Sequence, residues 1–444
     1  MTNSSEFQWF PTNAPAQRRY DDVYFINPST GWTVNSDGKI LATTDGSTWK
    51  EQFQTPIDPA SNRGIWLRCV GFSTPLNGWV GTVSTEQRLY HTIDGGITWE
   101  TVDNLPDEAP VKICGLSVVN ESVIYASGTN DPVDVSRMMK TVDGGKTWTA
   151  WDMSAHASAL IDVYFPTPDR GWVVGGFSDV PNPSRDDLIP VVLFTSDGGV
   201  TWENQVEDIR DSFPKGEWGW KIQFLNEQIG FVSLENLDEG AILKTTDGGV
   251  TWKRLPINDP QGNANLEGVG FVNENLGWVG GWGDENFSSG TSSQTTNGGD
   301  NWEDANQIGL FINRFRFLGD PVTVGYASGQ TVYKYAKVPV GVAAAQEVAP
   351  PTSFLKTNVP AKFERSVTVE FTLPENTKQA TINIWDRFGT HIRTLICETE
   401  PKVGQRSVVW DGIDDSGKNV SSGMFVYRLT VDSNAESRMI RLDN

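Results

Sequence analysis

Short apolar runs recur along the first three quarters of the chain, separated by turns rich in glycine and polar residues. In one stretch the runs are 161–165, 171–174 and 191–194, and a further run follows Trp202. Short apolar runs bounded by turn residues predict β-strands. This part of the chain is therefore predicted to form units of four strands.

The first strand of the unit recurs seven times, at 23–25, 70–72, 116–118, 163–165, 222–224, 269–271 and 315–317. The second strand begins with glycine and an aromatic residue in most units, as in Gly31-Trp32 and Gly171-Trp172. A four-stranded unit repeated at about 50 residues is typical of a β-propeller blade. We expect the glycine to let the strand approach the neighbouring sheet and the aromatic ring to fill the wedge between blades.

The seventh unit has three runs, at 313–317, 324–328 and 331–335, but no fourth. Residues 7–10 resemble a fourth strand without its preceding turn. We therefore predict that residues 7–10 pair with 331–335, with Trp9 beside that strand, and close the ring. Closure would remove the open sheet edges that invite aggregation.

A Thr-x-Asp-Gly-Gly-x-Thr-Trp motif separates the third and fourth strands. Its copies are spaced 49, 49, 54, 50 and 50 residues apart. Asp-Gly between apolar runs predicts a tight turn, the carboxylate can accept hydrogen bonds from the turn amides, and the Trp can pack beneath it. We interpret the motif as structural, since catalysis needs one arrangement at one place. Its residues are Asp45, Trp49, Asp94, Trp99, Asp143, Trp148, Asp197, Trp202, Asp247, Trp252, Asn297 and Trp302.

The composition changes after the last repeat. Residues 336–351 are rich in proline and alanine and predict a linker between domains. Residues 352–444 hold six or seven alternating runs separated by turns, which predicts a small β-sandwich. We therefore expect an all-β chain with a seven-bladed propeller at 1–335, a linker at 336–351 and an immunoglobulin-like sandwich at 352–444.

Charge and composition exclude several classes of protein. The net charge is −21, from 56 acidic and 35 basic residues, which argues against a nucleic-acid partner. No apolar run is long enough to span a membrane. The first ten residues lack the features of a signal peptide, so either a signal segment has been removed or export uses another route. The three cysteines and three histidines are scattered, which predicts neither a metal site nor a cofactor.

The repeated motif resembles the Asp-box, or bacterial neuraminidase repeat, family. The period and the Gly-Trp-Val-Gly strands are most similar to the photosystem II assembly and stability factors. That resemblance covers residues 7–335 and implies a seven-bladed propeller that binds a partner protein without chemistry. Other members are sialidases, sortilin-type receptors and xyloglucan hydrolases, so the resemblance indicates fold more strongly than function.

The C-terminal region resembles a second family. Its motifs are Ile384-Trp385-Asp386, Val409-Trp410-Asp411-Gly412 and the run from Val420 to Leu429. They are similar to the immunoglobulin-like domain of flagellar hook-capping proteins and to type 9 secretion sorting domains. This resemblance implies an export or surface-attachment module.

One group of residues departs from the acidic background and lies in or beside the innermost strands. Two interpretations are open. The group lines the mouth of the central channel as a basic, aromatic site for an acidic peptide or anion, or it pairs internally with Asp21, Asp22, Asp162 and Glu267, which occupy equivalent strand positions; we favour the internal pairing. The candidate ligand-binding residues are Trp66, Arg68, Trp218, Trp220, Lys221, Arg314 and Arg316, with Arg18 and Arg19 close by.

The sequence contains no nucleophile elbow, phosphate loop or zinc spacing, and no motif marks a catalytic carboxylate pair. We therefore interpret the chain as a non-catalytic binding or scaffold protein of an exported or cell-surface assembly. It would engage a protein or glycan partner through the face opposite the Asp-Gly turns, with residues 352–444 as a possible attachment module. The alternative is a glycoside hydrolase of the Asp-box propeller type.

Overall fold

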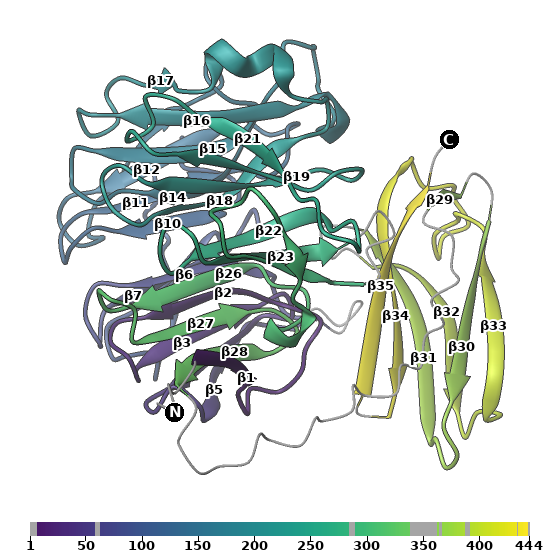
Figure 1. Ribbon diagram of the computed structural model, residues 1–444. Helices are drawn as coiled ribbons and strands as arrows, with labels where there is room; N and C mark the ends of the chain where they lie inside the picture. Colours follow the sequence, from purple (N-terminus) through teal and green to yellow (C-terminus); the bar gives the residue numbers. More distant parts are fainter. Residues whose placement is uncertain are drawn as a thin grey trace, which may run out of the picture.

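The computed structural model describes residues 7–57, 63–283, 289–337, 362–363, 366–386, 391–432 and 434–442. Within them, seven four-stranded antiparallel sheets form the larger domain (Figure 1). In six of these sheets the strands follow one another along the chain from the innermost to the outermost strand. The seventh sheet is the exception, because its outermost strand comes from the beginning of the chain. The predicted seven-bladed propeller is confirmed.

The first three blades cover residues 20–152. The strands are β2 (Tyr20–Phe25), β3 (Gly31–Asn35), β4 (Lys39–Thr43) and β5 (Trp49–Gln54); β6 (Leu67–Phe72), β7 (Gly78–Thr82), β8 (Leu89–Thr92) and β9 (Glu100–Thr101); and β10 (Gly115–Val118), β11 (Ile124–Gly128), β12 (Arg137–Thr141) and β13 (Thr149–Asp152).

The next three blades cover residues 159–304 and include short 3₁₀ helices in their connections. The elements are β14 (Ala159–Tyr164), β15 (Gly171–Phe177), η1 (Arg185–Asp187), β16 (Ile189–Thr195) and β17 (Glu203–Asn204); η2 (Glu207–Ser212), β18 (Trp218–Phe224), β19 (Gly230–Glu235), β20 (Ala241–Thr245) and β21 (Lys253–Pro256); and β22 (Ala264–Phe271), β23 (Gly277–Gly283), β24 (Ser292–Thr295), β25 (Glu303–Asp304) and η3 (Asn306–Ile308).

The two ends of the propeller sequence meet in the seventh blade. Its strands β26 (Arg314–Leu318), β27 (Val324–Ser328) and β28 (Val332–Lys337) are completed by β1 (Phe7–Pro11). β1 pairs antiparallel with β28, and Trp9 lies opposite Tyr335. The Trp9 ring also contacts Trp278 of blade six at 5.5 Å and Phe315 at 5.7 Å between centroids. The predicted closure is confirmed, and it ties blade six to both ends of the sequence.

Aromatic rings interlock between blades, but the glycines act differently from our expectation. Trp32 of blade one stacks on Phe72 of blade two with centroids 3.5 Å apart. Gly78 pairs with Phe72 in the same blade, and a Cβ on Gly78 would lie 2.5 Å from that ring. The glycine therefore makes room for the first-strand aromatic of its own blade, not for the neighbouring sheet. Tyr326 of blade seven stacks on Phe25 of blade one with centroids 3.5 Å apart, so the same kind of contact joins the last blade to the first.

The Asp-Gly turns use their side chains as hydrogen-bond acceptors. In the fourth blade, Asp197 accepts hydrogen bonds from the amides of Val200 and Thr201 at 3.0 and 2.9 Å and from the Thr201 hydroxyl at 2.6 Å. These bonds lower the pKa of Asp197 to about 2, and the bond from the Thr201 hydroxyl contributes most. Gly198 and Gly199 have φ values of 74° and 94°, which favour glycine.

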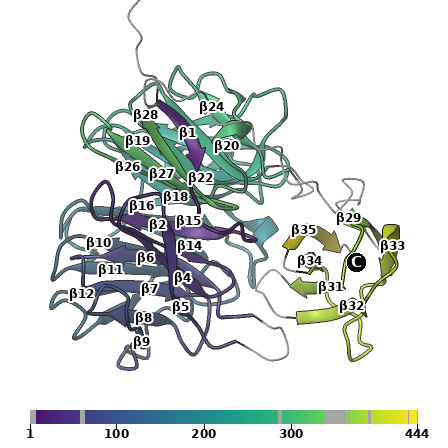
Figure 2. The ribbon, with the colours of Figure 1, turned by 90° about the horizontal axis from the view of Figure 1, so that it is seen from below.

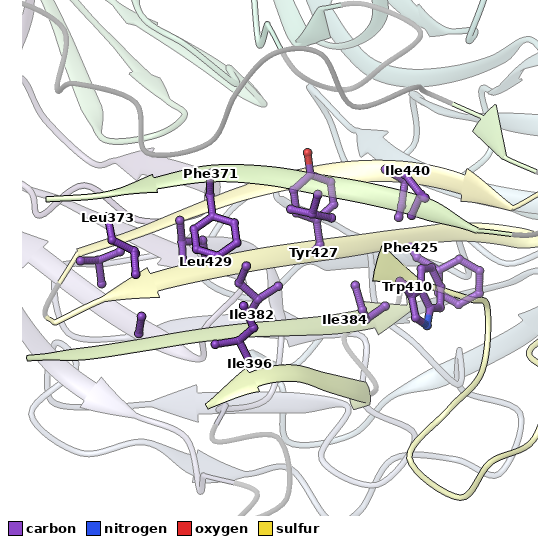
Figure 3. Close-up of a cluster of buried hydrophobic side chains, with 14 of the residues drawn as sticks. Phe371, Leu373, Ile382, Ile384, Ile396, Trp410, Phe425, Tyr427, Leu429 and Ile440 are labelled. Carbon is purple, nitrogen blue, oxygen red and sulfur yellow. The ribbon is translucent and has the colours of Figure 1, made fainter. Parts of the chain in front are cut away.

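Among the described residues, the C-terminal domain forms two facing sheets. One has the order β29-β35-β34-β31-β32 and the other pairs β30 with β33, and the immunoglobulin-like sandwich is confirmed. Figure 3 shows Phe371, Ile382, Trp410, Tyr427 and Leu429 meeting between them as a buried core. The strands are β29 (Lys362–Phe363), β30 (Val367–Leu373), β31 (Gln379–Asp386), β32 (His391–Thr399), β33 (Gly404–Trp410), β34 (Gly423–Val431) and β35 (Asn434–Leu442).

The C-terminal domain lies beside the propeller, with β34 and β35 nearest to it in two perpendicular views (Figures 1 and 2). The predicted linker at 336–351 falls almost entirely outside the described residues. The domain boundaries that depend on it therefore stay a proposal.

Trp9→Ala tests the closure. We expect it to lower the free energy of unfolding by about 2–3 kcal/mol, because it removes a large, half-buried ring that contacts two blades. Urea denaturation measures the change. Gln8→Ala, at an exposed position on the same strand, is the matched control and should change stability by less than about 0.5 kcal/mol. Equal effects of the two substitutions would contradict the closing role of Trp9.

Asp197→Asn tests the carboxylate in the turn. A lowered folded pKa means that the charged carboxylate stabilises the fold above about pH 4, and that this contribution is lost as the pH falls toward 2. We expect a lower melting temperature than wild type at pH 7 and a difference that narrows steadily below pH 4. Glu203→Gln, an exposed carboxylate in the same blade, should leave the whole profile unchanged. A difference independent of pH would contradict this account.

Candidate functional site

Charged side chains gather at the start of the innermost strands, around the central channel. Arg19 contacts Asp21 at 2.6 Å and also contacts Glu267, while Arg68 contacts Asp21 at 2.9 Å. All four are at most 2% exposed. Three blades thus share one buried network, since Asp21, Arg68 and Glu267 lie on β2, β6 and β22.

A second network joins blades one, four and seven. Arg314 donates to Asp22 at 3.0 Å and forms two hydrogen bonds of 2.7 Å with Asp162. Asp22 also accepts from the Val70 amide and Asp162 from the Ile222 amide, each in the following blade. Burial disfavours the charge on Asp162, but Arg314 more than compensates and lowers its pKa to about 2.

β-Bulges place several of these side chains. The pairing of β2 with β3 shifts register between Tyr20 and Asp22, so that Asp21 is the extra residue. The same irregularity occurs around Arg68 in β6 and around Glu267 in β22. A bulge redirects side chains locally, which explains how adjacent residues of one strand contribute to the channel.

Lys221 is the least satisfied cation of the channel. It is 1% exposed, and its Nζ has no hydrogen-bond partner within the described residues. Burial, together with repulsion from Arg314 and Arg68, lowers the pKa of Lys221 to about 8 despite the nearby Asp162 and Asp22. Lys221 therefore loses its proton at a lower pH than an exposed lysine does.

The candidate tryptophans supply further donors. Trp66 is half-buried and its ring lies under the guanidinium groups of Arg18, at 5.4 Å, and Arg68, at 5.9 Å. Trp218 and Trp220 are 1% and 5% exposed and contact each other edge to face. The Nε1 atoms of all three have no hydrogen-bond partner in the described part of the chain. Trp66 and Trp220 thus add two donors to the cations around the channel.

Arg316 lies apart from the other candidates. It sits two residues beyond Arg314 on β26, donates to the Val23 carbonyl at 3.2 Å and faces the ring of Tyr24. Burial and the nearby Arg314 lower its pKa. The structure therefore brings Trp66, Arg68, Trp220, Lys221 and Arg314 to the channel and places Arg316 deeper along the same strand. Trp218 packs instead in an apolar cluster with Ala159 and Leu188. The structure also contains the internal ion pairs that we favoured from the sequence.

One described carboxyl has a raised pKa, but its surroundings do not suit acid catalysis. Burial raises the pKa of Glu217, which is fully buried before β18. Arg254 donates to both of its oxygens at 2.8–3.2 Å. Arg254 also contacts Glu239 at 2.8 Å, so one guanidinium group holds both acids.

The contact between the two domains was not predicted from the sequence. Asp37, Arg63 and Asp186 lie in connections opposite the Asp-Gly turns, and all three contact the C-terminal domain. Arg428 contacts Asp37 at 3.3 Å, and Arg441 contacts Asp186 at 3.1 Å. The only signal in the sequence was opposite charge: basic residues in the last strands and acids in the long loops.

Lys221→Met tests the electrostatics of the channel. Because the folded pKa of about 8 lies below the usual value near 10.5, the unfolded chain binds more protons between these values, and wild-type stability should rise with pH there. We expect Lys221→Met to raise the free energy of unfolding by about 1–3 kcal/mol at pH 7, with a smaller gain at pH 9.5. Urea denaturation at both pH values measures it. The exposed Lys146→Met should show neither effect, and a destabilised Lys221→Met would contradict the assignment.

Comparison with known proteins divides the chain into the same two parts. Residues 1–129 match the family described as photosynthesis system II assembly factor YCF48, and residues 357–437 match the FlgD Ig-like domain. The photosystem II assembly lipoprotein Ycf48 of Nostoc sp. is 24% identical over 213 residues, covering 47% of this chain and 52% of that protein. The protein of the same name from Synechococcus sp. is 27% identical over 154 residues, covering 34% and 42%. The chain thus spans about half the length of the curated relatives it matches.

Solved structures agree on the fold. Ycf48 bound to a D1 peptide has a TM-score of 0.52 at 17% identity, covering 75% of this chain and 97% of that one. The GH74 enzyme of Niastella koreensis has a TM-score of 0.53 at 11% identity, covering 97% of this chain and 73% of that one. PorZ, a surface component of the type-IX secretion system of Porphyromonas gingivalis, has a TM-score of 0.50 at 12% identity, covering 97% of this chain and 60% of that one. The chain therefore combines a propeller that resembles the photosystem II assembly factor Ycf48 with a C-terminal domain that resembles the FlgD Ig-like domain.

Proposed function

We propose that this protein is a non-catalytic scaffold that binds a partner protein through the propeller face opposite the Asp-Gly turns. The observation that carries the proposal is the gathering of cations and aromatic rings at the channel, where Arg68 faces the rings of Trp66 and Trp220 and Lys221 lies close by. Lys221 Nζ and the Nε1 atoms of Trp66 and Trp220 have no partner in the described residues. Buried donors without acceptors are costly, so a ligand rich in carbonyl or carboxylate oxygens is favoured there.

The chemistry of the channel supports binding over catalysis. The carboxylates of Asp21, Asp22, Asp162 and Glu267 all contact arginine side chains. A general acid or base needs an oxygen free to exchange a proton with the substrate, whereas these carboxylates are held in hydrogen bonds by arginine. The Ycf48 relatives support the same proposal, since they are named as assembly factors and one was solved with a bound peptide.

We also propose an exported location. The Ycf48 relatives are named lipoproteins, and PorZ is described as a surface component of a secretion system. The described residues include no helix with the length and apolar character needed to cross a membrane. The C-terminal domain would then serve attachment or sorting, as its likeness to a flagellar domain suggests. Its contact with the binding face makes partner recognition by both domains a further part of the proposal.

Paired variants of the full chain test the proposed face. We expect Trp66→Ala, which removes a ring at the channel mouth, to weaken partner capture from native extracts about tenfold, the scale of an aromatic hot spot. Val200→Ser, at a position 81% exposed in an Asp-Gly turn, should leave capture unchanged. Quantitative mass spectrometry of captured proteins is the measurement. Equal capture by both variants, or turnover of glycans in a panel with product detection, would overturn the proposal.

A further inference from the structure

A cavity of about 590 Å³ lies between blades four and five, beside the Asp-Gly turn of blade five. Its volume falls within the usual range of sites for small ligands, roughly 300–1,000 Å³. Blade four supplies Arg170, Phe194 and the outer strand β17, and the connection to blade five supplies part of η2. The cavity is thus separate from the channel mouth and belongs to the side of the propeller that carries the turns.

Blade four departs from the repeat at this cavity. Arg170 directly precedes the second strand of its blade. Phe194 is aromatic where blades three and five have Lys140 and Lys244, which pair with the same strand position. The other six blades have an uncharged residue at the position of Arg170, namely Thr30, Asn77, Val123, Ile229, Leu276 and Thr323. A blade therefore forms without a charge there, and packing alone does not account for Arg170.

Arg170 is held by aromatic rings and not by an acid. Its guanidinium carbon lies 5.1 Å from the centroid of the Trp172 ring and 5.7 Å from that of Phe194. Its buried Nε has no hydrogen-bond partner, and its side chain forms no ion pair in the described part of the chain. A Cβ atom on Gly248 would lie 3.4 Å from Arg170 Nη2, which places the guanidinium group beside the turn of blade five. A planar guanidinium group without a counter-ion suits a carboxylate, which it can bind through two parallel hydrogen bonds.

Gln205 adds a second donor to the cavity. Its Oε1 accepts hydrogen bonds from Trp172 Nε1 at 2.9 Å and from Trp252 Nε1 at 3.2 Å. These two bonds fix the amide group beside Gly249 of the turn. The Nε2 of Gln205 has no hydrogen-bond partner among the described residues, so it is available to a ligand oxygen.

Two carboxylates of the cavity are available to a cation. Glu203 on β17 and Asp208 on η2 are exposed and form neither a side-chain hydrogen bond nor an ion pair with any described residue. The other two acids are occupied, since Glu207 contacts Arg210 at 3.5 Å and Asp247 accepts hydrogen bonds within its own turn. The cavity thus offers donors to an anion and carboxylates to a cation.

We propose that this cavity binds a short peptide with both termini free. The C-terminal carboxylate of the peptide accepts hydrogen bonds from Arg170 and from the Gln205 amide. Its N-terminal ammonium group lies against Glu203 and Asp208. A ligand with one charge would leave either the cation or the acids without a counter-charge, which is why a zwitterion fits better than an anion, a cation or a neutral polyol. The inference goes beyond the proposed function, because the cavity and the channel mouth are different places on the propeller.

Calorimetric titration of the full chain with four probes tests the pattern of charge. The probes are trialanine, N-acetyl-trialanine, which lacks the ammonium group, trialanine amide, which lacks the carboxylate, and maltotriose, which is a neutral polyol. We expect saturable binding of trialanine and binding of the other three that is weaker by about tenfold or more, because each loses at least one charge-assisted contact. Either blocked peptide binding as tightly as trialanine, maltotriose binding more tightly, or no saturable trialanine binding would overturn the proposal.

Variants assign each terminus to its partners. Arg170→Gln should weaken trialanine binding about tenfold, the scale of one charge-assisted hydrogen bond, and should leave the binding of trialanine amide unchanged. Glu203→Gln combined with Asp208→Asn should weaken trialanine binding and leave that of N-acetyl-trialanine unchanged. Arg137→Gln, on β12 of blade three, is the matched control and should change trialanine affinity by less than about twofold. Equal losses in Arg170→Gln and Arg137→Gln, or losses that ignore which terminus is blocked, would refute the site.

The result is independent of the proposed function. Trp66→Ala changes the channel mouth and should bind trialanine as tightly as wild type does, whereas loss of trialanine binding in this variant would place the peptide at the channel and overturn the cavity. Partner capture that does not depend on Trp66 would sink only the proposed function. The four probes decide the matter on the unaltered chain, so the test stays usable if Arg170→Gln misfolds.

Discussion

Ring closure is the constraint on which the rest of the propeller depends. Blades pack as wedges, so each needs a neighbour on both sides, and an open array would expose a sheet edge and an apolar face at each end. The pairing of Trp9 with Tyr335 completes blade seven with residues from the beginning of the chain, which removes the open sheet edge and the exposed apolar face. Stacking of Phe25 on Tyr326 then joins blade one to blade seven in the same way that other neighbours are joined. Only a closed ring can bring charged residues from blades one, two, four, six and seven into one channel.

Repetition made the fold predictable from sequence, because every blade repeats the same apolar runs and the same turn. It also revealed the seventh blade, whose missing strand pointed to residues 7–10. The role of the blade glycines was predicted wrongly for a physical reason. The sequence shows that Gly78 begins a strand, but not that Phe72 lies opposite it and folds its ring over the vacant Cβ position. That relation depends on strand register, which the pattern of apolar residues does not specify at single-residue precision.

The candidate site was predictable in its residue types and less so in its geometry. The cluster of arginine, lysine and tryptophan at the start of inner strands was visible, as were the acids at equivalent positions. Which residues face the channel depends on bulges, since Asp21 and Asp22 are adjacent and would point to opposite sides of a regular strand. The contact with the C-terminal domain was not predictable, because Asp37, Arg63 and Asp186 lie in connections that have no equivalent from blade to blade.

The distribution of charge indicates that some charged residues hold the fold together and that others bind a ligand. Inside the ring, Arg314 with Asp22 and Asp162, and Arg19 with Asp21 and Glu267, are paired across blades and hold the ring together. Toward the C-terminal domain, Arg428 and Arg63 approach Asp37 and Arg441 approaches Asp186, so ion pairs also join the two domains. Lys221 and Trp220 lack such partners among the described residues, and they are therefore better explained by a ligand than by the stability of the ring.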